Sequence, residues 1–346
     1  MTRKRHILYF SVAALLSALW LTACTTDDID EPEVPQKDNT IPVEINIQYE
    51  DALSRASDNA TLSVNRILIL PFRKTNESLA TSEPANFVPD YAAAKQITLH
   101  SFPVTSTKLN LQATSTYRIV VLGYNRNDYN FNNPTAASRL FDIGSVSTPA
   151  TLANLYVKPI NPTYGVPEFF SCQCIGNMNG TAIGTAFLPG QVNQITGTLK
   201  RIVSGLTVQI NNIPTFVKFV TLVAENLVTA TRITDGSAML WQTTGDGSPR
   251  ILGTQVPTSG SVNLSYYLLA IPDARKTLFY LDVSYGSFTE RYTIKVADEP
   301  GKVSGNRFIF LPNYQLTVTG DYSKINLGFI LTHNVNLDDN TWDGIQ

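Results

Sequence analysis

Side chains that do acid–base or metal chemistry are sparse in this chain of 346 residues. Its three histidines are His6, His100 and His333. No two of them have the spacing of a zinc site, and the sequence has no phosphate-binding glycine loop and no nucleophile elbow. A catalytic triad needs a base within hydrogen-bond reach of its nucleophile, and no motif marks His100 or His333 as that base. The sequence therefore predicts a protein that is not an enzyme and has no cofactor.

Two further groups of residues have side chains that bind metals in other proteins. Cys172 and Cys174 share a face if they lie on one strand, but a zinc site usually needs a second pair, so we interpret both as reduced packing residues. The oxygen-bearing residues 338–341 lack the glycine and the distal glutamate of an EF-hand loop. We therefore expect no metal at either place, and a solvated tail at residues 338–341.

Cys24 has the strongest motif around it. Three basic residues precede a mostly apolar run at residues 7–23. A charged start, a short apolar run and small residues at its end are typical of a signal peptide, whereas the alternative, a membrane-spanning anchor, usually needs ~20 apolar residues. The sequence Leu21-Thr22-Ala23-Cys24 resembles a lipobox, in which a peptidase cuts between Ala23 and Cys24 and a lipid is attached to the Cys24 sulfur. We expect residues 1–23 to be removed as a signal peptide.

The segment that follows Cys24 is acidic. Residues 24–55 hold nine acidic residues and two basic ones. The proline-containing start of this segment cannot bury enough apolar surface to fold, so we expect a solvated tether there. Its acidic run also resembles the surface-export signal of Bacteroidetes lipoproteins, which implies the outer face of the cell outer membrane, with the lipid in the bilayer. From Ala56 onward the charge is close to neutral, which argues against a nucleic-acid partner.

Alternation of apolar and polar residues dominates from residue 41 onward. It predicts a strand with one buried face, formed by Ile41, Val43, Ile45, Ile47 and Tyr49. Residues 62–70 begin by alternating and become wholly apolar, as a central strand does. A Gly-Ser pair at residues 286–287 predicts a tight hairpin turn. Further strands are predicted at residues 117–124, 206–210, 218–223, 266–271, 278–285, 288–296, 307–311, 314–319 and 325–331.

Helical patterns are scarce. Only residues 91–96 and 149–155 suggest short helices. Many strands at short spacing with turn residues between them predict an all-β chain built from β-sandwiches. The pair Pro189-Gly190 and a strand pattern that restarts at Leu199 suggest a boundary near residues 190–200. The chain after Arg55 is long enough for two domains of ~150 residues each.

Four segments together resemble the fimbrillin family, the subunits of Bacteroidetes type V pili. They are the lipobox followed by the alternating strand and Ser54-Arg55-Ala56, then residues 60–70, 198–206 and 311–320. Their order and spacing match the family over nearly the whole chain, although each motif alone is weak. The resemblance implies two transthyretin-like Greek-key β-sandwich domains in tandem, at residues 56–198 and 199–346. It also implies that an Arg-specific protease cuts between Arg55 and Ala56 and removes the strand before it.

In such a pilus, a strand from the next subunit fills the groove that the removed strand leaves. An incomplete sandwich exposes unpaired backbone groups, which pair readily with another chain. Our first candidate donor is residues 325–331, with Ile325, Leu327, Phe329 and Leu331 facing the groove; the second is residues 335–345. The partners expected are other pilus subunits and a ligand on a host or bacterial surface. Two alternatives stay open: a pilus anchor that keeps its lipid, and a glycan-binding surface lipoprotein with exposed aromatic residues.

Overall fold

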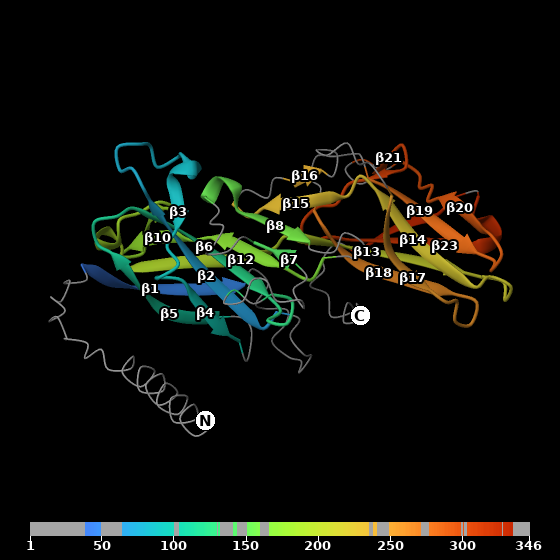
Figure 1. Ribbon diagram of the computed structural model, residues 1–346, viewed down its shortest axis with the longest axis horizontal. Helices are drawn as coiled ribbons and strands as arrows, with labels where there is room; N and C mark the ends of the chain where they lie inside the picture. Colours follow the sequence, from blue (N-terminus) through green and yellow to red (C-terminus); the bar gives the residue numbers. More distant parts are fainter. Residues whose placement is uncertain are drawn as a thin grey trace, which may run out of the picture. The chain divides into compact units, whose positions relative to one another are not determined.

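A computed structural model describes most of the chain that follows residue 38. Its described residues are 39–49, 64–99, 104–129, 131, 141–143, 151–159, 166–234, 238–240, 249–270, 277–298, 300, 303–326 and 328–334. Within them the chain is built from β-strands with short 3-10 turns, so the all-β prediction is confirmed (Figure 1). No helix in these ranges is long and apolar enough to cross a membrane. Cys24, Arg55 and Ala56 lie outside the described residues.

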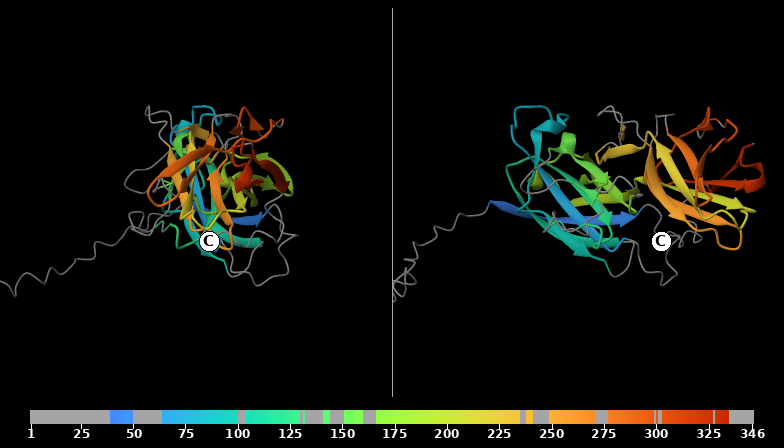
Figure 2. Two further views of the ribbon diagram at one scale, coloured as in Figure 1. Left: turned by 90° about the vertical axis from the view of Figure 1, so that its right-hand side faces the viewer. Right: turned by 45° about the vertical axis from the view of Figure 1, so that its right-hand side comes forward.

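The first sheet is organised around the alternating strand near the N-terminus. Its strands, in spatial order, are β5 (Val104–Gln112), β1 (Thr40–Tyr49), β12 (Gln194–Arg201), β10 (Ile175–Met178) and β11 (Thr181–Gly184). β1 runs parallel to β12 and antiparallel to β5. Figures 1 and 2 show β1, in blue, running between these two strands.

The second sheet continues from the end of β12. The strands that follow are β9 (Phe170–Gln173), β6 (Tyr117–Tyr124) and β2 (Arg66–Lys74), and β2 pairs along its other edge with β4 (Lys95–Thr98) and β3 (Phe87–Pro89). Six consecutive residues of β2 are buried, as predicted for a central strand. One face of β2 and β6 packs against the buried side chains of β1, and the other face belongs to a second hydrophobic cluster.

Two four-stranded sheets follow in the C-terminal half, and both contribute to that second cluster. One has the order β18 (Val262–Leu269), β13 (Val203–Asn211), β23 (Gln315–Asp321) and β24 (Ile330–Asn334). The other has the order β17 (Arg250–Gln255), β14 (Phe219–Glu225), β19 (Leu278–Ser284) and β20 (Thr289–Thr293). β13 and β23 are parallel, and their ladder pairs Gly205 and Leu206, at the end of the family-like segment 198–206, with residues 315–316 of the family-like segment 311–320.

A smaller sheet connects strands from both halves. Its order is β16 (Ala238–Leu240), β15 (Val228–Arg232), β8 (Tyr156–Pro159) and β7 (Phe141–Asp142). β8 precedes the boundary that we expect after residue 198, and β15 follows it. The two-domain division therefore stays a prediction. A two-stranded ribbon, β21 (Val303–Ser304) and β22 (Arg307–Phe308), completes the strands that the structure describes.

Several predicted elements are confirmed, and others are wrong. β6 coincides with the predicted strand, and the hairpin turn between β19 and β20 is present, with Gly286 at φ +97° and a 2.9 Å hydrogen bond from the Tyr285 amide to the Phe288 carbonyl. The helix predicted at residues 91–96 is wrong: a turn there leads into β4, because pairing with β2 outweighs the helix preference of the alanines. Of the helix predicted at residues 149–155, the described residues contain only the 3-10 turn Leu152–Asn154.

The predicted strand at residues 325–331 is also wrong in its bounds. A 3-10 turn spans Tyr322–Lys324 and is capped by the Asp321 carboxylate, which accepts from the Ser323 amide. Gly328 then lies at φ +138°, a conformation that interrupts an extended strand. Only from Ile330 does the chain pair with β23, as β24.

Candidate functional site

Strand β1 is bonded to a neighbour along each of its edges. Its residues 44–49 form a parallel ladder with β12, and its residues 40–48 form an antiparallel ladder with β5. The Gln48 side chain also donates a hydrogen bond to the Thr198 hydroxyl of β12, at 3.1 Å. β1 is therefore a central strand of its sheet, although it is the first strand among the described residues.

The buried face of β1 consists of the residues that the alternation predicts. Val43, Ile45, Ile47 and Tyr49 are between 0% and 4% exposed, whereas Ile41 is half-buried at the rim. The Tyr49 ring meets the Phe170 ring edge-on, with 4.9 Å between the centroids. Four side chains of β1 are thus part of a hydrophobic core that it shares with the other strands, and Ile41 packs against the edge of that core.

Next to Ile47, the neighbouring strand β12 has a glycine against which two sulfur atoms lie. Gly197 of β12 lies opposite Ile47, and a Cβ added to it would stand 2.7 Å from the Cys174 sulfur and 3.0 Å from the Cys172 sulfur. Both cysteines are free. The hydrogen bond with Cys172, together with burial, raises the pKa of the Cys174 thiol, so this thiol stays protonated and packs as an apolar group.

A buried ion pair lies where β12 ends. Arg201 donates from Nε and Nη2 to the Glu168 carboxylate at 2.9 and 2.7 Å, and from Nη1 to the Asn313 side chain just before β23. Its guanidinium carbon is 5.0 Å from the centre of the Phe170 ring, the ring that Tyr49 contacts. Burial by itself would lower the pKa of Arg201, but the Glu168 carboxylate outweighs this and raises it, so Arg201 stays charged.

Neither Glu168 nor Arg201 was identified as a functional candidate from sequence. Arg201 lies within the family-like segment 198–206, and Asn313 lies within 311–320. The structure joins these two segments through the Arg201–Asn313 bond and through the bond from the Ser204 hydroxyl to the Leu311 carbonyl. The only sequence signal for the pair was an arginine at the end of a strand-like run, and that signal does not name its partner.

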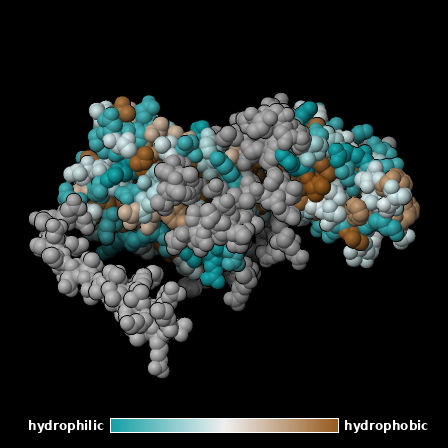
Figure 3. Space-filling model, in the orientation of Figure 1, coloured by the Kyte–Doolittle hydropathy of each residue, from teal (hydrophilic) through white to brown (hydrophobic). Residues whose placement is uncertain are grey.

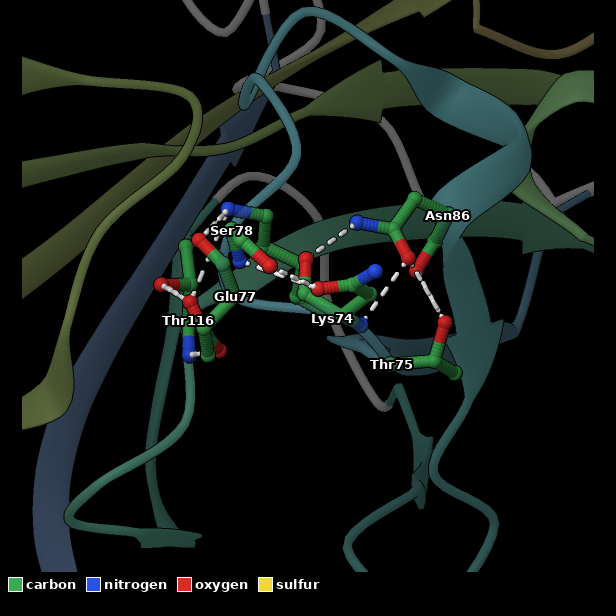
Figure 4. Close-up of polar contacts among 7 residues, drawn as sticks. Lys74, Thr75, Glu77, Ser78, Asn86 and Thr116 are labelled. Carbon is green, nitrogen blue, oxygen red and sulfur yellow. Dashed lines mark hydrogen bonds and ion pairs between the residues drawn. The ribbon is translucent and has the colours of Figure 1, made fainter.

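A polar network holds the turn through which β5 continues into β6. Figure 4 shows Glu77 accepting from the Thr116 amide and hydroxyl, at 2.9 and 2.8 Å. The Lys74 ammonium lies 3.6 Å from this carboxylate, and Asn86 bonds to the hydroxyl of Thr75 at 2.6 Å. Burial alone would raise the pKa of Glu77, but the bonds from Thr116 and the charge of Lys74 outweigh it and lower this pKa.

The last residue of β5 is tied to the second sheet as well. The Gln112 side chain accepts a hydrogen bond from Arg73 of β2 at 2.6 Å, and the Gln112 backbone amide donates to the Tyr117 hydroxyl of β6 at 3.3 Å. That hydroxyl donates in turn to Asp90 at 2.8 Å. This end of β5, like the turn beyond it, is therefore held by side chains outside β1.

The residues of the first predicted donor strand are packed in their own half of the chain. Ile325 and Phe329 are each 6% exposed and belong to the hydrophobic cluster around the C-terminal sheets. Ile330, between Phe329 and Leu331, is 71% exposed. Leu327 and the side chain of Leu331 lie outside the described residues, as do residues 335–345.

The two histidines beyond the signal-like segment are not brought together with a nucleophile by any described contact. His333 lies in β24, opposite Leu316 of β23, and His100 is outside the described residues. No group of three or more acidic, histidine or cysteine side chains suited to a metal occurs within the described ranges.

Comparison with known proteins gives distant structural likenesses. No family model matches the chain, and no curated protein does. Among solved structures, the fimbrial anchor protein Mfa2 of Porphyromonas gingivalis is 11% identical, with 81% of this chain and 91% of that chain covered and a TM-score of 0.45. The tip fimbrial protein Mfa3 of the same organism, with a C-terminal truncation, is 13% identical, with coverage of 86% and 99% and a TM-score of 0.42.

A third solved structure is that of a candidate cell adhesion protein from Bacteroides eggerthii. It is 14% identical to this chain, with coverage of 85% and 95% and a TM-score of 0.46. The three structures named here are thus those of two fimbrial proteins and one candidate adhesin. All three likenesses are distant, so the roles of β1 and of individual residues are argued only from the sequence and structure of this chain.

Proposed function

We propose that this protein is a structural subunit of a type V pilus, in the stalk or at the tip, and that it assembles by strand exchange for surface adhesion. The supporting observation is β1. It is the first strand among the described residues, it forms ladders along both edges, and it buries alternate side chains in a core formed with later strands. Residues 24–55, with Cys24 as the lipid carrier, would hold the precursor at the outer membrane until cleavage after Arg55 detaches the strand.

The energy of the β1 contacts suits a strand that stays until it is cut. Val43, Ile45 and Ile47 are fully buried aliphatic side chains, each worth ~1.5–3 kcal/mol, so together they contribute about 5–9 kcal/mol before costs. While β1 is part of the chain, its high effective concentration keeps the groove filled. Cleavage after Arg55 turns β1 into a peptide that dilution can remove, and a strand from another subunit can then enter.

Removal of β1 would leave a specific template. β5 and β12 would each present unpaired backbone groups along the edge that now faces β1, and unpaired strand edges recruit strands from other chains. A strand that matched β1 fully would alternate, with apolar side chains directed at the positions of Val43, Ile45, Ile47 and Tyr49. This pattern defines the kind of partner segment that fits.

We further propose that the donor is the second candidate, residues 335–345. This segment presents Val335, Leu337 and Ile345 on one face, with Asp339 and Asp343 between Leu337 and Ile345, so it matches only part of the apolar pattern of β1. The first candidate, residues 325–331, would have to withdraw Ile325 and Phe329 from their own core before it could enter a groove elsewhere. A deletion of residues 335–346 tests this choice, because the truncated protein should fold and accept a strand but should not extend a filament. Filaments of normal length from the truncated protein would refute it.

The main test compares cleavable and uncleavable precursors. Purified chain from residue 24 onward, without lipid, is treated with an Arg-specific protease, and the products are examined by mass spectrometry and electron microscopy. We expect a new N-terminus at Ala56, loss of the β1 peptide and formation of filaments. The Arg55→Lys variant keeps the charge but resists the protease, so it should stay monomeric.

Two outcomes would count against the proposal. If the chain extracted from the cell surface keeps its N-terminus at a lipidated Cys24, the protein is the pilus anchor, in which β1 stays in place. If cleavage occurs and β1 leaves but no filaments form with this chain or with related subunits, strand exchange is not its mode of assembly.

A further inference from the structure

A cluster of aromatic side chains lies far along the chain from β1, at one end of the C-terminal sheets. We call it the aromatic cluster; it consists of Phe216, Tyr285, Phe288, Tyr292 and Tyr322. Phe216 comes from the β13–β14 connection, Tyr285 and Phe288 from the turn between β19 and β20, Tyr292 from β20, and Tyr322 from the 3-10 turn after β23. In Figure 3, light-brown apolar atoms are visible at the end of the molecule where these elements lie in Figure 1.

Three rings of the cluster are stacked, and the two outer ones are exposed to solvent, whereas Tyr285, Tyr292 and Tyr322 are half-buried. Tyr285 lies between Phe216 and Phe288, with centroid separations of 6.0 and 4.7 Å and an angle of 28° to each ring. Phe216 is 58% exposed and Phe288 is 56% exposed. Single exposed apolar residues are common on proteins, but a stack of rings with two of them more than half exposed is a contiguous apolar surface that usually marks a binding site.

A chain of hydroxyl groups and a carboxylate runs beside these rings. The Tyr285 hydroxyl is 2.8 Å from that of Tyr322 and 3.2 Å from that of Tyr292. Tyr292 donates to Oε2 of Glu290, which Tyr285 also reaches at 3.3 Å. Glu290 is exposed, and its other oxygen, Oε1, has no hydrogen bond from any described residue. A strong acceptor therefore stands next to the apolar faces.

The backbone under the cluster is held in place. The Gly286 turn fixes Tyr285 and Phe288, and the Lys218 amide donates to the Ser284 carbonyl at 2.7 Å. The connection before β14 is tied to the 3-10 turn by a 2.7 Å bond from Asn212 to Asp321. Burial, followed by the bond with Tyr292, raises the pKa of Tyr285 to about 12, so its hydroxyl keeps its proton at neutral pH. The surface is thus arranged before any ligand arrives, which lowers the entropic cost of binding.

We propose that the aromatic cluster with Glu290 is a binding site for a neutral carbohydrate. A pyranose ring has an apolar C–H face that matches the exposed rings of Phe216 and Phe288, and it has hydroxyl groups at its edge that can donate to Oε1 of Glu290. An apolar protein surface would cover that carboxylate without offering a donor, which is unfavourable for a charged group. This mixture of flat apolar faces and a few placed polar groups is typical of small-ligand sites.

The site is independent of strand exchange, because it shares no residue with β1, β5 or β12. The test therefore uses the uncleaved Arg55→Lys chain, which keeps its own β1. A panel of immobilised neutral oligosaccharides is screened first, and the best of them is measured by isothermal titration calorimetry.

Variants of the exposed rings and of Glu290 test the site residue by residue. We expect Phe216→Ala combined with Phe288→Ala to weaken binding at least about tenfold, and Glu290→Gln to weaken it several-fold while the rings remain. Tyr314→Ala removes an aromatic ring that is 42% exposed elsewhere and should leave binding unchanged. Circular dichroism of each variant checks that the fold is retained.

Three results would overturn the proposal. One is the absence of binding to every sugar on the panel, and another is binding that survives the double phenylalanine variant. The third is self-association: if sedimentation shows the Arg55→Lys chain to be a dimer that this double variant dissociates without any sugar, the cluster is an interface between copies of the chain.

Discussion

Ile45 allows the contribution of β1 to be measured directly. It is 0% exposed at the centre of β1 and packs in the cluster formed with β2, β6 and β12. Replacement of a buried isoleucine by alanine costs ~2–5 kcal/mol, because the transfer energy of the lost methyl groups is joined by the cost of a cavity. Ile45→Ala should therefore lower the free energy of unfolding of the Arg55→Lys precursor by about that amount.

The same loss should appear as weaker binding once β1 is a separate peptide. A loss of about 2 kcal/mol in binding free energy corresponds to a roughly 30-fold larger dissociation constant. We would measure unfolding in urea by circular dichroism, and the retention of a fluorescent peptide of residues 40–55 on the cleaved body by anisotropy. Ile330→Ala, at a position that is 71% exposed, is the matched control and should change stability by less than ~0.5 kcal/mol. Equal effects of Ile45→Ala and Ile330→Ala would refute the view that β1 is held by its buried face.

Three further predictions concern the frame of the groove. Gly197→Ala should lower the free energy of unfolding of the precursor, measured in urea, by about 1–3 kcal/mol, because the added Cβ would stand 2.7 Å from the Cys174 sulfur. Cys174→Ala in the same chain should restore part of that loss. An unchanged stability of Gly197→Ala would contradict the close packing. Glu168→Gln removes the countercharge of a buried Arg201 and should cost ~3–5 kcal/mol, whereas an exposed substitution such as Glu83→Gln should cost almost nothing. The folded pKa of Glu77 is lowered, so its stabilisation is complete above the unfolded pKa, which is about 4.3, and is lost as the pH falls through the folded value. In the Glu77→Gln variant, the free energy of unfolding should therefore fall less steeply with pH in that acidic range, and its pH dependence near pH 7 should be unchanged. The same acid dependence in the variant and the parent would contradict this role of Glu77.

The parts of the fold that could be predicted from sequence are those with a strong local pattern. In β1, apolar and polar residues alternate over the whole strand, and β6 is a short run rich in β-branched residues. The β19–β20 turn has a glycine where the backbone needs a positive φ. The two strands that flank β1 were missed. After Val104, β5 has two threonines and a serine in place of large apolar residues, and β12 has Gly197 near its centre, so neither stands out from a loop. Their pairing is a tertiary property that no short window contains.

The same distinction holds at the candidate site. The inward residues of β1 follow from a period of two, but the Glu168–Arg201 pair joins residues that are 33 positions apart, and no periodicity marks it. The strand predicted at residues 325–331 failed because alternation was read through Gly328, whose backbone conformation breaks the strand. Pattern alone therefore predicted which strand fills the groove but not what the groove is made of.

The two strands that flank β1 differ in how they are held, and this difference would give the proposed strand exchange a direction. β12 also pairs with β9 and β10, whereas the only strand partner of β5 among the described residues is β1. Side chains at Thr116 and Gln112 tie down one end of β5. When β1 leaves, β12 should thus remain as the fixed template, on which an incoming strand pairs in parallel as β1 does, and β5 should close over it afterwards.

Hydrogen exchange of the cleaved body, freed of the β1 peptide, tests this order. Amides of residues 104–112 should lose most of their protection, while those of residues 194–201 that bond to β9 and β10 should keep theirs, and an added strand should restore protection in β5. Uncleaved Arg55→Lys protein gives the reference. If both strands lose protection equally, the groove is not preformed and the incoming strand must fold it anew. In that case the incoming strand would not pair with a preformed edge. It would instead fold together with β5 and β12, because neither strand would stay ordered without a strand between them.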